Sequence, residues 1–429
     1  MNRTGGSRVR STGKPERVGA SGDPTIKYRE ALAWLYQLQR FGIKLGLENI
    51  QRLIAELHVD LAQSRVIHVA GTNGKGSVCA MIDSICRAAN YQTGLFTSPH
   101  LVTFRERIRV NGEIISEDAV ATGLTIIRDL LRDWDPHPTF FEITTALALK
   151  HFTGAKIDIV ILEIGLGGRL DATNAVQSTV AVITPIDLDH QKWLGETLAE
   201  IASEKAGIIK PKTAVVSASQ LPEAAKVIRS RAAECEAPSQ IVEESYEQSP
   251  IALRGAHQKQ NAALAIAAIR AGKIDIDDAA IARGLLSVEW PARFQCWDDR
   301  IIIDGAHNPA SARVLAETWR ENFGEQRATL ILAVLSDKDL RGICEALAPI
   351  SDFIFLPHIR SERAVDPKEL ANVLVDLAMK HEVCADIAEA LAKARALPSP
   401  ILLTGSLHFA GEALAHLQGQ PAAFEECAQ

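Results

Sequence analysis

The segment with the strongest chemical signal holds three glycines, a lysine and a serine within seven residues, Gly71-Thr72-Asn73-Gly74-Lys75-Gly76-Ser77. It follows an apolar run over 66–70 and precedes an amphipathic stretch over 78–88. A strand, a glycine loop and a helix in this order hold nucleotide phosphates, because backbone N–H groups converge on the phosphate oxygens. Lys75 would neutralise the terminal phosphates, and the Ser77 hydroxyl would reach Mg²⁺. This composition disfavours a plain strand-to-helix turn and predicts ATP or GTP as the ligand.

Two further groups that could bind a cation follow predicted strands. Glu163 comes directly after the apolar run 157–162, and His190 lies shortly beyond the run 180–184. In open parallel sheets ligands bind beyond the carboxyl ends of the strands, so both side chains could meet near the triphosphate as Mg²⁺ ligands. A carboxylate is a natural ligand for that ion, and an imidazole is a less usual one. The alternatives are a salt-bridged carboxylate for Glu163 and a packed or helix-capping histidine for His190.

These residues need a scaffold, and the apolar pattern predicts one. Short apolar runs separated by helix-like stretches lie at 66–70, 157–162, 180–184, 213–217, 301–303, 330–334, 353–356 and 401–404. This alternation predicts parallel α/β sheets covered by helices on both faces. Pro291 disfavours helix at Trp290, and the rhythm restarts after Arg300. The predicted domains are 28–292 and 293–429, preceded by a Gly-, Ser- and Arg-rich tail over 1–27 that favours disorder.

Composition disfavours several classes of function. The 429 residues are 47% hydrophobic and 23% charged with a net charge of −7, which is ordinary for a globular protein and disfavours a nucleic-acid partner. Seven cysteines without a CxxC pair predict free thiols in a reducing cytosol and give no support to a zinc site. No apolar run approaches the roughly 18 residues of a membrane span. We expect a cytoplasmic monomer that acts on small molecules and binds neither nucleic acid nor membrane.

Further short motifs follow the glycine loop along the chain: Thr97-Ser98-Pro99-His100-Leu101, Phe141-Glu142, Leu162-Glu163-Ile164-Gly165-Leu166-Gly167-Gly168-Arg169-Leu170-Asp171-Ala172-Thr173-Asn174, Asp189-His190 with Leu194-Gly195, Glu204-Lys205-Ala206-Gly207-Ile208, Arg293-Phe294, and Asp304-Gly305-Ala306-His307-Asn308-Pro309. The ordered set resembles the folylpolyglutamate synthase/dihydrofolate synthase family of Mur-ligase-like, ATP-dependent amide ligases. The resemblance implies an α/β fold, with a P-loop-containing Mur-ligase-like central domain and a smaller Rossmann-like C-terminal domain.

The resemblance also implies a reaction. ATP phosphorylates the carboxylate of a pterin substrate, the amine of L-glutamate attacks the acyl phosphate, and an amide forms with loss of phosphate. Cations must stabilise the transferring phosphoryl group. The implied catalytic residues are Lys75, Asp171, Lys205 and His307. Lys205 matches the family's carbamylated lysine (N6-carboxylysine), which forms from the unprotonated amine that a partly desolvated lysine can supply.

The same resemblance assigns ligands to individual positions. Mg²⁺ would occupy two sites, one at Ser77 and one formed by Ser98, Glu163 and His190. The nucleotide would lie against Thr72, Asn73, Gly74, Lys75, Gly76, Ser77, Asn261, Arg293 and Asp304. His307 would contact the acyl phosphate or the incoming glutamate; the alternative, by sequence alone, is a histidine at a helix start in a strand-to-helix loop.

Pterin recognition separates members of this family. Thr139-Phe140 and Leu170-Asp171-Ala172 match the segments that line the dihydropteroate pocket of bifunctional bacterial enzymes, and an aromatic ring beside a flat pterin is physically sensible. Phe140 stands where Tyr is often found, and residues 42–47 resemble the family's N-terminal substrate loop. The leading interpretation is a bifunctional ligase that adds L-glutamate to dihydropteroate and to reduced folates such as tetrahydrofolate.

Four alternative functions share parts of this pattern. The nearest is a folylpolyglutamate synthase that lacks the second activity. A Mur-type ligase of cell-wall precursors would need a dedicated UDP-sugar domain, for which the stretch between Tyr28 and Val66 is too short. A P-loop regulatory GTPase would not explain residues 304–309 or the second α/β unit. A binding protein without turnover would have no need of every proposed ligand, and all of them are present.

Overall fold

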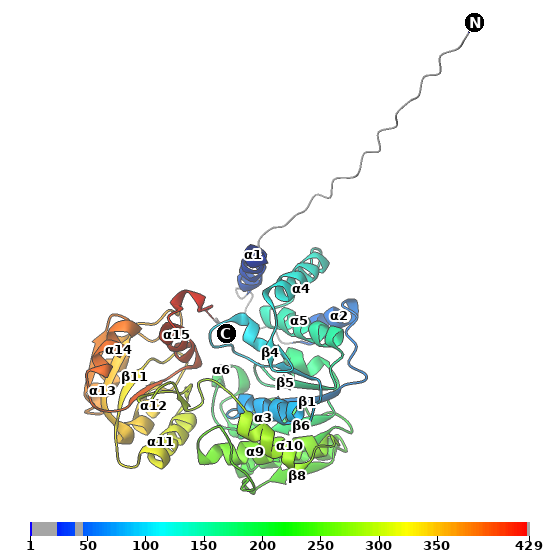
Figure 1. Cartoon of the computed structure of the whole chain (residues 1–429). Helices are drawn as coiled ribbons and strands as arrows, with labels where there is room; N and C mark the ends of the chain where they lie inside the picture. Colours follow the sequence, from blue (N-terminus) through cyan, green and yellow to red (C-terminus); the bar gives the residue numbers. More distant parts are fainter. Residues whose placement is uncertain (2–23, 39–45, 427–429) are drawn as a thin grey trace.

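The computed structural model describes residues 1, 24–38 and 46–426, which form two α/β domains lying side by side (Figure 1). The predicted tail over 1–27 lies outside the described residues except for Met1 and residues 24–27, with which helix α1 (Pro24–Gln37) begins. Most of the predicted substrate loop over 42–47 also lies outside them. Among the helices that the structure describes, none is long and apolar enough to span a bilayer.

The first domain is built on an eight-stranded sheet in the order β4-β3-β2-β5-β1-β6-β7-β8. Its strands are β1 (Arg65–Ala70), β2 (Thr93–Phe96), β3 (Ile108–Val110), β4 (Glu113–Ile114), β5 (Ile159–Glu163), β6 (Val180–Ile183), β7 (Ala214–Ala218) and β8 (Ser239–Val242). The neighbouring strands in the part β2-β5-β1-β6-β7-β8 pair parallel. The central strands of this part are buried runs rich in Val and Ile. Strands β3 and β4 pair antiparallel at one edge.

Helices cover both faces of this sheet. On one face lie α3 (Lys75–Ala88) and α9 (Ala256–Ala271), with α10 (Asp278–Ser287) packed against α3. On the other face lie α4 (Glu117–Leu130), α5 (Phe140–Ala155), α7 (Leu198–Ala206) and α8 (Pro222–Glu234). Helix α1 packs against α4, and α2 (Glu48–Glu56) packs against α5. The short α6 (Gln191–Leu194) and the 3₁₀ turns η2 (Phe104–Arg107) and η3 (Ala172–Ala175) lie in loops.

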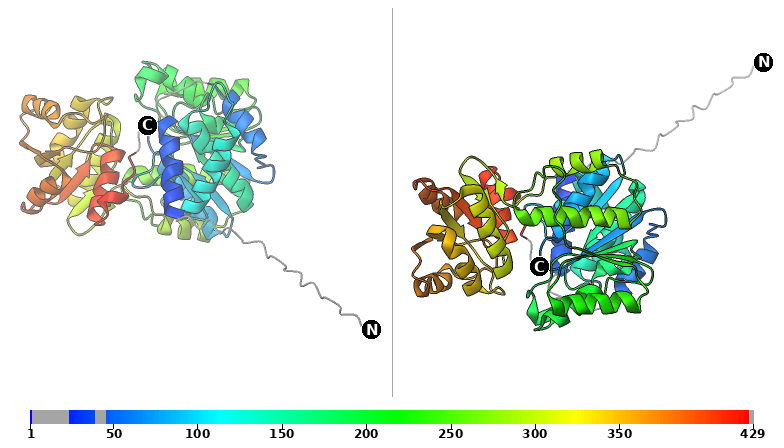
Figure 2. Two further views of the ribbon diagram at one scale, coloured as in Figure 1. Left: turned by 90° about the horizontal axis from the view of Figure 1, so that it is seen from above. Right: turned by 90° about the horizontal axis from the view of Figure 1, so that it is seen from below.

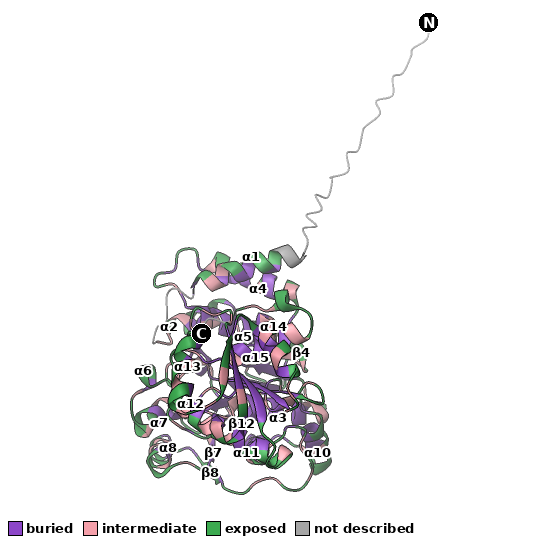
Figure 3. Cartoon of the chain, turned by 90° about the vertical axis from the view of Figure 1, so that its left-hand side faces the viewer, coloured by how far each residue is buried: buried purple, intermediate pink, exposed green. Residues whose placement is uncertain are grey.

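The second domain is built on a six-stranded sheet in the order β13-β12-β11-β14-β10-β9. Its strands are β9 (Gln295–Cys296), β10 (Ile301–Ile303), β11 (Ala328–Leu332), β12 (Ser351–Pro357), β13 (His381–Cys384) and β14 (Ile401–Thr404). One face packs against α11 (Pro309–Phe323), α12 (Leu340–Leu347) and α13 (Pro367–Asp376), and the other against α14 (Ile387–Arg395) and α15 (Leu407–Leu417). Turns η4 (Ala348–Ile350) and η5 (Pro421–Ala423) complete it. Figure 3 shows the buried strands between more exposed helices.

The predicted fold class, two α/β units with a P-loop in the first, is confirmed. The strands that the apolar runs predicted pair parallel with one another, and the short strands β3, β4 and β9, which were not predicted, add antiparallel pairs at the sheet edges. The predicted boundary at 292/293 falls in the link between α10 and β9. In the views from above and below in Figure 2 the two domains stay side by side, with the C-terminal end of the chain between them.

Candidate active site

A cavity of about 1200 Å³ opens between the two domains. Its walls are the loops that follow β1, β5 and β6 in the first domain and the loop between β10 and α11 in the second. The residues predicted as catalytic groups or as ligands of the nucleotide, the metals and the pterin all line this cavity: Thr72, Asn73, Gly74, Lys75, Gly76, Ser77, Ser98, Thr139, Phe140, Glu163, Leu170, Asp171, Ala172, His190, Lys205, Asn261, Arg293, Asp304 and His307. Positions far apart in the chain therefore share one site.

The glycine loop has the geometry of a phosphate-binding turn. Helix α3 begins at Lys75, directly after Gly74, whose φ of +87° favours glycine. A Cβ atom at Gly74 would lie 2.7 Å from the Asn261 Oδ1 atom, so α9 closes tightly on the loop. The Lys75 ammonium donates a hydrogen bond of 3.1 Å to the Thr72 carbonyl and thereby curls over the loop. Backbone donors at the start of a helix are suited to an anion.

The predicted ligands of a second metal follow three strands of the first sheet: Ser98 comes after β2, Glu163 ends β5 and His190 comes after β6. Glu163 is buried and accepts a hydrogen bond of 3.2 Å from the Ser98 N–H. Burial raises the pKa of Glu163, and nearby Lys75 opposes this effect. His190 is exposed and has a left-handed backbone, with φ of 51°, at the start of α6. The described residues hold no group of three or more His, Cys, Asp or Glu side chains that could bind a metal, so a cation here would also need hydroxyl, phosphate and water oxygens, as Mg²⁺ prefers.

Lys205 is a buried lysine on α7, a helix that starts with a Thr197–Glu200 capping box. Its ammonium donates a hydrogen bond of 2.8 Å to the Gly71 carbonyl at the start of the phosphate loop. Burial, reinforced by the charge of Lys75, lowers the pKa of Lys205 to about 7. A lysine with this pKa is a neutral amine in a large fraction of molecules near neutral pH.

Asp171 organises its own loop. One carboxylate oxygen accepts hydrogen bonds from the N–H groups of Gly165 (2.9 Å) and Leu166 (3.0 Å), and the other accepts from the Thr173 N–H (3.0 Å) and hydroxyl. Burial raises the pKa of Asp171, and these hydrogen bonds oppose that shift. The predicted catalytic group therefore also fixes the wall formed by Gly165 and Leu166.

The predicted pterin-binding residues Thr139 and Phe140 lie at the start of α5. The Thr139 hydroxyl caps the helix by accepting from the Glu142 N–H at 3.2 Å. Phe140 is mostly covered, and its ring stacks on Tyr36 with centroids 5.7 Å apart. Its neighbour Phe141 also lines the cavity and is less buried, so it offers more aromatic surface, and the sequence did not single it out as a ligand.

The second domain contributes two predicted polar groups at the end of β10. Asp304 accepts hydrogen bonds of 2.8 Å from the N–H groups of Phe294 and Ala306, and burial raises its pKa. The His307 Nδ1–H donates to the Gly305 carbonyl at 2.8 Å, which leaves Nε2 directed toward the first domain. Burial in the cavity wall lowers the pKa of His307 to about 4, so the imidazole is neutral at neutral pH.

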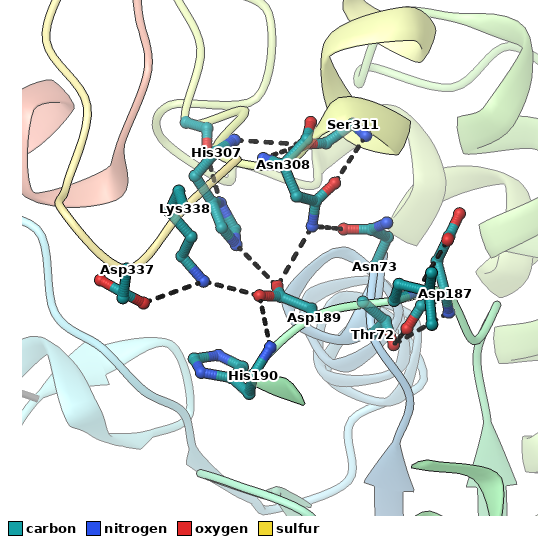
Figure 4. A network of polar contacts seen from close by, with 12 residues as sticks. Thr72, Asn73, Asp187, Asp189, His190, His307, Asn308, Ser311, Asp337 and Lys338 are labelled. Atoms are coloured by element: carbon teal, nitrogen blue, oxygen red, sulfur yellow. Dashed lines mark hydrogen bonds and ion pairs between the residues drawn. The ribbon is translucent and has the colours of Figure 1, made fainter. Parts of the chain in front are cut away.

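A network of polar contacts joins the domains across the cavity (Figure 4). The Lys338 ammonium lies 2.7 Å from Asp189 Oδ1, and both side chains are less than 10% exposed. The Asn308 amide donates to Asp189 Oδ2 at 3.2 Å and to Asn73 Oδ1 at 3.1 Å. Burial alone would raise the pKa of Asp189, but nearby His190, Lys338 and His307 hold it well below its usual range.

Two family models match the chain. The Mur ligase middle domain matches residues 69–236, and the Mur ligase, glutamate ligase domain matches residues 292–407. The dihydrofolate synthase/folylpolyglutamate synthase of Bacillus subtilis (strain 168) is 36% identical over 89% of this chain and 97% of its own length. The chain belongs to the dihydrofolate synthase/folylpolyglutamate synthase family.

Solved structures of this family are similar over almost the whole chain. Mycobacterium tuberculosis folylpolyglutamate synthase complexed with ADP is 32% identical with a TM-score of 0.85, covering 92% of this chain and 99% of that one. E. coli FolC in complex with DHPP and ADP is 33% identical with a TM-score of 0.81, covering 91% and 98%. The Yersinia pestis bifunctional enzyme, complexed with AMPPNP and Mn ion, is 31% identical with a TM-score of 0.83, covering 93% and 100%. The predicted family and the class of ATP-dependent ligase are confirmed.

Some residues of this family member's site were not predicted from the sequence. Lys338, Asp189 and Asn308 form a polar contact between the domains, and only the last two lie in motifs that the sequence singled out. One signal could have found Lys338: it follows β11 in the run Asp337-Lys338-Asp339, beyond the carboxyl end of a strand, where ligands bind in open sheets.

Proposed function

We propose that this ligase adds L-glutamate to dihydropteroate, forming dihydrofolate, and to tetrahydrofolate, through an acyl phosphate of the acceptor carboxylate. One observation carries the proposal: the same cavity is lined by the phosphate loop, by Phe140, Phe141 and Asp171 of the first domain, and by His307 of the second. The relatives are consistent with two acceptors or with one. The B. subtilis protein is named dihydrofolate synthase/folylpolyglutamate synthase, and the Lacticaseibacillus casei protein, 31% identical over 97% of its length, is named folylpolyglutamate synthase.

The nucleotide would bind with its phosphates on the glycine loop. The N–H groups at the start of α3 and the Lys75 ammonium face the same end of the cavity. Asn261 on α9 lies against this loop, and Arg293 and Asp304 line the same cavity from the side of the second domain. This arrangement would hold a triphosphate between the domains, where its terminal phosphoryl group could meet a carboxylate acceptor in the same cavity.

Two Mg²⁺ ions would complete the site. Ser77 is suited to a first ion beside the phosphates, and Ser98, Glu163 and His190 are suited to a second. When bound, the ions would neutralise charge on the transferring phosphoryl group. Glu163 is buried beside Lys75 and would stay ionised next to a cation, which favours its charged form.

Lys205 would act as N6-carboxylysine. Its buried, largely desolvated amine is the form that reacts with CO₂, and the product replaces a buried cation by an anion near the metal ligands. In the unmodified state the amine bonds to Gly71, so carbamylation would also change the contact that supports the phosphate loop.

The acceptor would lie on the wall formed by Thr139, Phe140, Leu170, Asp171 and Ala172, with Phe141 as a further aromatic neighbour. The incoming L-glutamate would approach from the second domain, where the neutral His307 imidazole presents Nε2 to the cavity. In this position His307 can accept a proton from the attacking ammonium or bond to the acyl phosphate.

The test is ATP-dependent release of phosphate by the purified protein with L-glutamate, Mg²⁺, bicarbonate and either acceptor. We expect release with dihydropteroate and with tetrahydrofolate. Release with tetrahydrofolate alone would reduce the enzyme to a folylpolyglutamate synthase. A folded protein that releases phosphate with neither acceptor would contradict the proposal and direct attention to other carboxylate acceptors.

We further propose that the enzyme acts as a cytoplasmic monomer. A single chain supplies every predicted ligand of the cavity, so no second copy is needed to complete the site. Sedimentation at micromolar concentration, with and without ATP, tests the oligomeric state. A dimer under either condition would contradict this part of the proposal.

A further inference from the structure

A histidine lies in the middle of the strand that leads to the phosphate loop. His68 is on β1 and is fully buried, between Leu162 of β5 and Ala181 of β6. It does not line the cavity. Burying an imidazole without a hydrogen bond destabilises a fold, so a histidine here needs a partner and a reason. Neither the nucleotide site nor the proposed metal site uses it.

The partner is a side chain of the acceptor wall. The His68 Nε2 atom lies 2.7 Å from the Thr173 hydroxyl, and that hydroxyl lies 2.5 Å from Asp171 Oδ1. Asp171 accepts from backbone N–H groups at both oxygens, so it acts as an acceptor and the Thr173 hydroxyl must donate to it. The hydroxyl oxygen then accepts from His68, which places the imidazole proton on Nε2. Burial lowers the pKa of His68 to about 3 and keeps the ring in this neutral form.

We propose that His68 is a positioning residue for the acceptor wall, acting through the Thr173 hydroxyl on Asp171. The chain of contacts runs from β1 to Thr173, from Thr173 to Asp171, and from Asp171 to the N–H groups of Gly165 and Leu166. The same strand continues into the phosphate loop, so this chain fixes the acceptor wall relative to the nucleotide. The inference rests on the proposed function, because it assigns the wall to a pterin acceptor.

Two substitutions cut this chain at different contacts. His68→Leu removes the donor to Thr173, and Thr173→Val removes the hydroxyl at nearly constant volume. Each should lower kcat/KM for dihydropteroate about tenfold, the size expected when one buried hydrogen bond is lost. The double variant should be no worse than either single one, since both interrupt the same chain. His68→Gln, which keeps an N–H donor on a side chain of similar length, should recover most of the activity.

The affinity for ADP separates positioning from general damage. The phosphate loop has its own contacts, so the Kd of a fluorescent ADP analogue should stay within about twofold in all variants. Thr329→Val is the matched control: Thr329 is buried in β11 of the second domain, and its hydroxyl has no hydrogen-bond partner among the described residues. It should keep wild-type kcat/KM.

Three results would overturn the proposal. The first is a wild-type kcat/KM for dihydropteroate in both His68→Leu and Thr173→Val. The second is a loss of ADP affinity as large as the loss of kcat/KM, and the third is a double variant whose loss of kcat/KM is the product of the two single losses. If His68→Leu does not fold, Thr173→Val decides by itself, with the same expected loss. Failure of the proposed function would look different, because the wild-type enzyme itself would then release no phosphate with either acceptor.

Discussion

Lys205 shows how one buried amine can control this site. Its ammonium donates a hydrogen bond to the Gly71 carbonyl, and burial lowers its pKa to about 7. Replacement by Met would remove the amine while filling most of its volume. We expect turnover to fall at least about hundredfold, as when a group that stabilises the transition state is lost. The free energy of unfolding should change by no more than about 1 kcal/mol, because the substitution also removes a buried charge.

Steady-state kinetics and thermal unfolding of Lys205→Met, beside Lys205→Arg, measure these effects. Arg keeps the positive charge and cannot be carbamylated under these conditions, so it should be as inactive as Met. A variant with near-normal turnover would show that the carbamate role is wrong.

The pKa of Lys205 gives a dependence on pH. The amine is protonated below about pH 7 in the folded protein and below about pH 10.5 in an unfolded chain, so the folded state loses its proton first. In CO₂-depleted enzyme the destabilisation by the buried ammonium is therefore complete below pH 7 and disappears as pH rises from about 7 to 10.5.

The same titration governs reactivation by CO₂. After depletion, the rate of activity recovery on adding bicarbonate should rise with pH through about 7, once corrected for the CO₂ concentration, because only the neutral amine reacts. Lys205→Met should show no response to bicarbonate. Recovery that does not change between pH 6 and 8 would contradict the assignment.

At the scale of elements, the sequence predicted best where the pattern is local. The glycine loop, the apolar runs of β1, β5 and β6, and the carboxylates and histidines that follow them were all evident, because parallel buried strands are continuous apolar runs. The strands that were missed are short or polar. β8 reads Ser-Gln-Ile-Val and β13 reads His-Glu-Val-Cys; both lie at a sheet edge, and only the last residue of each is buried, so neither forms an apolar run.

The phosphate loop depends on a backbone conformation that only glycine adopts easily. Gly74 has φ of +87°, and a Cβ there would lie 2.7 Å from the Asn261 Oδ1 atom. We expect Gly74→Ala to weaken ADP binding at least about tenfold, because the loop and α9 must separate to admit the methyl group. Isothermal titration with ADP measures the change.

Gly324→Ala is the matched control for that variant. Gly324, just after α11, also has a positive φ, of 60°, but a Cβ there would meet nothing within 4 Å. Both substitutions should destabilise the fold by about 1 kcal/mol through backbone strain. Equal ADP affinities for the two variants would show that the close approach to Asn261 has no part in nucleotide binding.

At the scale of the molecule, the site depends on how two domains meet, and no local pattern predicts that. Lys338 and Asp189 are 149 residues apart in the chain, and their pairing exists only because the sheets lie with these loops facing each other. The ordered motifs indicated that both domains contribute to one reaction. They could not indicate which side chains touch across the interface, because those contacts depend on how the surfaces of the two domains pack against each other.

The end of the chain makes a second bridge between the domains. After α15 the chain leaves the second domain and reaches the first (Figure 1), where the Glu425 N–H donates to the Val102 carbonyl at 2.8 Å. The Glu425 carboxylate accepts from the Tyr28 hydroxyl (3.1 Å), the Thr103 hydroxyl (3.1 Å) and the Phe104 N–H (2.6 Å). This anchor lies next to the loop that carries Ser98, so it ties the second domain to the proposed metal site.

Replacing Glu425 by Gln should weaken this bridge, because the carboxylate accepts from several donors at once and an amide has one acceptor oxygen and no charge. We expect a loss of about 1–2 kcal/mol in the free energy of unfolding, measured by denaturant titration followed by tryptophan fluorescence. Glu426→Gln is the control, since Glu426 is exposed and should leave the titration unchanged. If the two variants unfold alike, the chain end does not help to hold the domains together, and other contacts, such as those around Asp189 and Lys338 and between Arg254 and Asn322, do so.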